Sequence, residues 1–173
     1  MKASFKPLGL AAAVAAVTAG FAGVTQAQEE IAIANNSLGD AAIIPYYTAA
    51  GDFVTGLHII NTSNLTQVVK LRMRRGSDSM DALDFNLILS PEDEWTGFID
   101  DSSGDVVLAT EDNSCTAPLR ADGRFVMPPL YAEGADEGYI EIIGMGSASR
   151  TSPIGVGSLH NADGVPADCG SVE

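Results

Sequence analysis

Apolar and polar residues alternate with a period of two along three segments of the chain, Phe53–Ile60, Val68–Arg74 and Leu83–Leu89. This period places successive side chains on opposite faces of a strand, so each segment predicts a strand with one buried face. Five shorter segments predict further strands: Ala42–Tyr47, Trp95–Ile99, Asp105–Thr110, Phe125–Met127 and Gly138–Ile143.

Turn-forming residues separate these segments, and no long amphipathic helix lies between them. Short strands at close intervals are typical of antiparallel sandwiches. We therefore predict an all-β fold, an immunoglobulin-like antiparallel β-sandwich over residues 28–144. Residues 145–173 are rich in Gly, Ser, Ala and Pro and predict a loop-rich segment that covers the sandwich. Because a sandwich usually ends in a strand, we also hypothesise that the sequence is a piece of a longer protein.

The first 27 residues have the layout of a secretory signal peptide. Lys2 and Lys6 precede the apolar run Leu8–Val24, and Thr25-Gln26-Ala27 supplies a small-x-small cleavage site. The alternative is a membrane anchor, because 17 residues reach the lower limit of a membrane-spanning helix. The run is rich in Ala and Gly, and a cleavage site follows it directly. We expect cleavage and export to the periplasm, the cell surface or the medium.

The charge of the chain is strongly negative, with 23 acidic and 9 basic residues, a net charge of −14 and a pI near 4.2. Removal of residues 1–27 takes away two lysines and no acids, which leaves seven basic residues and a net charge of −16. This balance excludes a general binder of nucleic acid or anionic membranes, since either would need a basic surface.

Two cysteines, Cys115 and Cys169, follow the predicted leader. An even number of cysteines in an exported chain is most simply explained by one disulfide, which would tie the loop-rich segment to the sandwich. The alternative, a reactive or metal-binding pair, lacks a nearby cluster of His and Cys.

Four of the seven basic residues of the exported part lie within six positions: Lys70, Arg72, Arg74 and Arg75. The first three share one face of a predicted strand, and we refer to these four residues as the basic stripe. Arginine binds carboxylate and sulfate groups through two parallel hydrogen bonds, so the stripe is a candidate site for an anionic ligand. The alternative is structural, namely pairing with Asp81 and Asp84 on the following strand.

An acidic turn supplies a second candidate site. Asp100, Asp101 and Asp105 flank Ser102-Ser103-Gly104 and offer the oxygen ligands that calcium prefers. The spacing does not match a calcium hand, because the sixth position counted from Asp100 is Asp105 where the hand needs Gly. An irregular calcium site and a solvated acidic turn both remain open, and no other cofactor is indicated.

Catalytic motifs are absent from the sequence. The two histidines, His58 and His160, have no partner at an informative spacing, such as an H-E-x-x-H helix or a G-x-S-x-G turn. We expect His58, which lies within a strand, to be packed in the interior. The run Glu92–Glu94 offers paired carboxylates for glycoside cleavage, but adjacent acids on a turn are usually solvated. The prediction is a protein without catalytic residues.

Several motifs resemble an uncharacterised family of exported bacterial proteins. They are Gly39-Asp40-Ala41-Ala42-Ile43-Ile44-Pro45-Tyr46-Tyr47-Thr48, the Asn61-Thr62-Ser63 turn, and Leu83-Asp84-Phe85-Asn86 followed by Leu89-Ser90-Pro91-Glu92-Asp93-Glu94-Trp95-Thr96. The resemblance covers residues 39–145 and implies export but no activity, so it assigns no catalytic residue.

These observations together predict a structural or adhesion-type interaction module at the cell envelope, with a protein or glycan as its partner. Tyr46, Tyr47 and the basic stripe are the candidate binding residues. The runner-up is a calcium- or carbohydrate-binding module, and the third hypothesis is a hydrolase.

Overall fold

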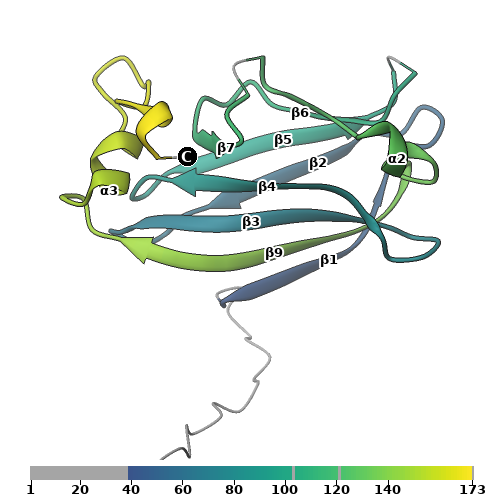
Figure 1. Ribbon diagram of the computed structural model, residues 1–173, viewed down its shortest axis with the longest axis horizontal. Coiled ribbons are helices and arrows are strands. Elements are labelled where there is room, and N and C mark those ends of the chain that lie inside the picture. The colour runs from purple at the N-terminus through teal and green to yellow at the C-terminus, as the bar shows by residue number, and fades with distance from the viewer. Residues whose placement is uncertain (1–38, 103, 121, 173) are drawn as a thin grey trace, which may run out of the picture. The chain divides into compact units, whose positions relative to one another are not determined.

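The computed structural model describes residues 39–102, 104–120 and 122–172 (Figure 1). The predicted leader lies outside the described residues. Within these residues, nine strands follow one another, with two short α-helices and one 3₁₀ turn. The strands are β1 Ala41–Thr48, β2 Thr55–Ile60, β3 Thr66–Arg75, β4 Asp81–Leu89, β5 Glu94–Asp100, β6 Val107–Ala109, β7 Cys115–Ala117, β8 Arg124–Val126 and β9 Glu137–Ala148. The helices are α2 Pro129–Ala132 and α3 Pro153–Ser158, and the 3₁₀ turn is η1 Cys169–Ser171.

The strands form two antiparallel sheets that pack face to face (Figure 1). The five-stranded sheet has the order β1-β9-β3-β4-β7, and the four-stranded sheet has the order β2-β5-β6-β8. The prediction of an all-β antiparallel sandwich is confirmed, whereas the immunoglobulin-like connection stays a prediction. Each of the eight predicted segments overlaps a strand, and β7 was not predicted.

One hydrophobic core fills the space between the two sheets. Leu71 and Met73 of β3 and Phe85, Leu87 and Leu89 of β4 are buried, as the period of two predicts. From the facing sheet, Phe125 stacks on Phe85 with ring centroids 4.1 Å apart, and the indole of Trp95 lies 6.2 Å from Phe85 at an angle of 57°. Burial of these large side chains is the main favourable term for this fold.

Gly97 is required by the packing of Trp95. A Cβ atom at Gly97 would lie 2.5 Å from the nearest atom of the Trp95 ring, closer than nonbonded carbons approach. The two residues lie on the inner face of β5, and the indole covers the glycine. The same alternation turns Phe98 outward, where it is 40% exposed.

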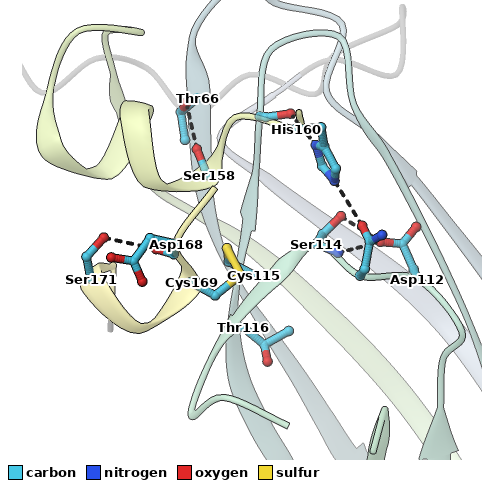
Figure 2. The surroundings of a disulfide bond; sticks show 12 residues. Thr66, Asp112, Ser114, Cys115, Thr116, Ser158, His160, Asp168, Cys169 and Ser171 are labelled. Atoms are coloured by element: carbon cyan, nitrogen blue, oxygen red, sulfur yellow. Dashed lines mark hydrogen bonds between the residues drawn. A yellow bond between two sulfur atoms is a disulfide. The ribbon is translucent and has the colours of Figure 1, made fainter. Parts of the chain in front are cut away.

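The C-terminal segment covers one end of the outer face of the five-stranded sheet. Ile88 alternates with the inward residues of β4 and points to this outer face, where Val172 and the disulfide cover it. The predicted disulfide Cys115–Cys169 is confirmed (Figure 2). Close to it, the Thr66 and Ser158 hydroxyls lie 3.2 Å apart and join α3 to β3. Residues 145–172 are therefore loop-rich but also hold α3 and η1, which the composition did not predict.

No helix in the described part of the chain is long and apolar enough to cross a bilayer.

Candidate functional site

Lys70, Arg72 and Arg74 of the basic stripe lie on the outer face of the five-stranded sheet, with a carboxylate beside each cation. Lys70 Nζ lies 3.5 Å from Asp84 Oδ2, and both Arg72 and Arg74 lie 3.0 Å from Asp81 Oδ1. These are the cross-strand pairs that the structural interpretation of the stripe requires. On the other side of β3, Glu141 of β9 lies 3.1 Å from Arg74 Nε and 3.8 Å from Arg72 Nη1.

The ion pairs shift the pKa of two groups, the Arg74 guanidinium and the Asp78 carboxyl. Partial burial by itself lowers the pKa of the Arg74 guanidinium, but the hydrogen bond to Glu141 and the charges of Asp81 and Glu141 outweigh it and raise that pKa. Arg75 pairs with Asp78 in the turn after β3, and its hydrogen bond holds the pKa of the Asp78 carboxyl below its usual range. The stripe therefore has no cation without a carboxylate partner.

The two predicted tyrosines occupy different environments. Tyr47 is fully buried and its hydroxyl donates a hydrogen bond to the Ala135 carbonyl oxygen at 2.8 Å. Burial, with a smaller contribution from Asp136, raises the pKa of Tyr47 to about 12. Tyr46 is exposed and donates to Glu137 Oε1 at 3.0 Å. Only Tyr46 is thus available to a ligand at the surface.

The predicted calcium residues lie at the end of β5 and in the loop that follows. Asp100 Oδ1 accepts hydrogen bonds from the Ser102 amide at 3.1 Å and the Ser102 hydroxyl at 2.8 Å, which closes a tight turn. Among the residues that the structure describes, no group of three or more His, Cys, Asp or Glu side chains is arranged to hold a metal ion. The geometry gives the calcium alternative no support.

The expectation that His58 packs in the interior is wrong. His58 alternates with the inward residue Leu57, so it points to the outer face of β2, and its Nε2 lies 3.0 Å from Glu94 Oε2. The side chain is about half exposed. The period of two, applied strictly, would have predicted this.

His160 joins three segments that are far apart in the sequence. Its Nδ1 lies 3.1 Å from Ser90 Oγ in the turn between β4 and β5, and its Nε2 lies 3.0 Å from Asn113 Oδ1 before β7. Ser90 Oγ also donates to Asp93 Oδ2 at 3.0 Å. A hydroxyl, an imidazole and an amide in a row resemble a nucleophile with its base. Here, however, the Ser90 hydroxyl donates its proton to the Asp93 carboxylate and not to the imidazole. The cluster instead attaches the C-terminal segment to the turns before β5 and β7.

Two cavities open at the side of the sandwich where β4 and β8 lie. The larger, of about 600 Å³, is lined by residues of β4 and β8 and by Met80, Arg120, Pro128 and Tyr131; we call it the β4–β8 groove. Arg74, at the end of the basic stripe, also lines it. The second, of about 420 Å³, lies beside it and shares Arg120. Neither cavity is lined by His160 or by Glu92–Glu94.

Open strand edges border the β4–β8 groove. Among the described residues, β7 pairs with Asn86, Leu87 and Ile88 of β4, so residues 81–85 have β3 as their single partner strand, and the short helix α2 also contacts β4. β8 ends the four-stranded sheet, and in the described part of the chain it pairs with β6 alone. Backbone amide and carbonyl groups on such edges can pair with an added strand.

Arg120 differs from the cations of the basic stripe, each of which has a carboxylate partner. It is exposed, lines both cavities and forms no ion pair with any described residue. Sequence reasoning missed it because it lies between two predicted strands, Asp105–Thr110 and Phe125–Met127, and belongs to neither. The only signal was its place between two turn-forming segments, Ala117-Pro118 and Asp122-Gly123.

Comparison of the chain with protein-family models, curated proteins and solved structures returned no match.

Proposed function

We propose that the protein is an exported, non-catalytic interaction module that binds an extended acidic polypeptide segment in the β4–β8 groove. The observation that carries the proposal is Arg120, an exposed guanidinium without an ion pair among the described residues, in the wall of a cavity bordered by open strand edges. The disulfide and the layout of the first 27 residues are compatible with export.

The groove offers three kinds of contact to one ligand. The open edge of β4 offers backbone hydrogen bonds, which fit an extended chain of any sequence. Met80 and Val126, each about half exposed, offer apolar contacts. Arg120 offers two parallel hydrogen bonds to a carboxylate, and this contact selects an acidic side chain.

The test uses a blocked pentapeptide of alternating valine and threonine with a central glutamate, labelled with a fluorophore and followed by anisotropy. We expect Arg120→Gln to weaken binding about tenfold, the effect of losing one charge-assisted hydrogen-bonded pair. The melting temperature should not change, because the side chain is exposed. Arg150→Gln is the matched control, since Arg150 is also exposed and lines neither cavity.

Two changes to the peptide separate the contacts. Replacing the glutamate of the peptide by glutamine should lower its affinity for the wild-type protein as much as Arg120→Gln lowers the affinity for the glutamate peptide. N-methylation of alternate amides should abolish binding if the peptide pairs with a strand edge. The proposal fails if the wild-type protein shows no saturable binding at about 1 mM peptide, or if Arg120→Gln and Arg150→Gln bind equally well.

A further inference from the structure

The edges of the two sheets formed by β1 and β2 differ from the rest of the surface in charge. β1 ends the five-stranded sheet and β2 ends the four-stranded sheet. The Thr48 amide of β1 donates to Thr55 Oγ1 of β2 at 3.0 Å, so the two edges are adjacent there. Neither strand contains an Asp, Glu, Lys or Arg, in a chain that has 23 acidic residues.

Large apolar side chains are exposed along these two strands and the turn between them. Five of them are each more than half exposed: Ile43, Tyr46, Phe53, Val54 and Ile60. Single exposed apolar residues are ordinary, but several along one pair of strand edges mark an association surface.

Only part of β1 is protected against pairing with another strand. Natural sheets protect their edges with charges, prolines or bulges. β1 has Pro45 and a bulge between Ile44 and Tyr47, and these protect its second half. Ala41–Ile44 pairs with β9 on one side and has no strand on the other side among the described residues.

We infer that the protein forms a two-fold dimer in which Ala41–Ile44 of β1 pairs antiparallel with the same residues of a second copy. An antiparallel pair of identical segments is self-complementary, as a two-fold axis requires. With the axis between Ala42 and Ile43, the two five-stranded sheets join into one, and Asp40 lies opposite Pro45 of the second copy.

Charge favours a second copy as the occupant of this edge. Two chains, each with a net charge of −14, or −16 without residues 1–27, repel each other wherever their acidic faces meet. The uncharged edge is where a second copy approaches without placing one carboxylate against another. Because salt screens the remaining repulsion, dimerisation should tighten with ionic strength, the opposite of an interface held by ion pairs.

Sedimentation of the full exported protein at low and high salt tests the inference, over concentrations up to about 0.1 mM. The wild-type protein should dimerise, and more tightly at high salt. Ile43→Lys should weaken the dimer at least about tenfold, since it places an ammonium group in the interface. Leu130→Lys is the matched control, because Leu130 on α2 is 78% exposed and the change in charge is the same.

The inference is overturned if the wild-type protein is monomeric at both salt concentrations, if Ile43→Lys still dimerises, or if Leu130→Lys weakens the dimer equally. An unchanged melting temperature of Ile43→Lys excludes unfolding as the cause. Arg120→Gln should remain dimeric, so failure of the dimer and failure of peptide binding in the groove are distinguishable.

Discussion

Tyr47 should make the stability of this protein fall steeply in alkali. The hydroxyl is buried and donates to the Ala135 carbonyl, so the folded state favours the neutral phenol. Its pKa is about 12 in the folded protein, against 10.0 for an ordinary tyrosine. Between these values the unfolded chain releases the proton and the folded chain retains it. The contribution of Tyr47 is therefore complete below pH 10 and is lost as the pH rises to about 12.

The size of the loss follows from the shift in pKa. Each pKa unit corresponds to about 1.4 kcal/mol, so the rise from 10.0 to about 12 removes roughly 2 to 3 kcal/mol. At neutral pH, Tyr47→Phe loses one hydrogen bond and should destabilise the protein by about 1 kcal/mol. Near pH 12 the order of stability of the two proteins reverses, because phenylalanine cannot ionise. We thus expect the phenylalanine variant to be the more stable protein in strong alkali.

Urea unfolding followed by the fluorescence of Trp95, the single tryptophan, measures this at several pH values. All other titrating groups are the same in wild type and variant, so the difference between their free energies of unfolding reports on Tyr47 alone. Tyr46→Phe is the matched control: the neighbouring tyrosine is exposed, and its loss should not reverse the order. If the free energies of unfolding of wild type and Tyr47→Phe differ by the same amount from pH 8 to 12, burial does not raise the pKa of Tyr47.

Three further predictions use the same unfolding assay. Replacing Cys115 and Cys169 by alanine opens a loop with a sequence separation of 54 and should cost about 4 kcal/mol in the chain-entropy model; a loss below about 1 kcal/mol would contradict it. Gly97→Ala should cost about 1 to 3 kcal/mol and shift the Trp95 emission, because the methyl group overlaps the indole; an unchanged spectrum and stability would show that the core has room. Calcium and EDTA should leave the melting temperature equal, and stabilisation by calcium would revive the Asp100 turn as a site.

The strands were predictable because their signals are local, and the disulfide was predictable because the chain has just two cysteines. Alternation along β3 and β4 places Leu71 and Phe85 inside and Lys70 and Asp84 outside, without reference to any other strand. The pairing of the basic stripe with Asp81 was also within reach, since β3 and β4 are joined by a short turn. Its pairing with Glu141 was not, because that residue lies 67 positions beyond Arg74.

The β4–β8 groove was beyond sequence reasoning for the same reason. It exists because β7 covers only part of β4, and β7 is a three-residue strand without a period to detect. The exposed side chain of His58 shows the opposite situation. Its outward position follows from the period of two, whereas the residue type suggested burial.

The most direct test of the β4–β8 groove is a map of amide chemical-shift changes in the ¹⁵N-labelled protein titrated with the glutamate pentapeptide. We expect the largest changes on residues 81–85 of β4, on β8 and on Arg120. They should disappear in Arg120→Gln and persist in Arg150→Gln. Changes centred on the basic stripe away from the groove, or on β1, would contradict this expectation.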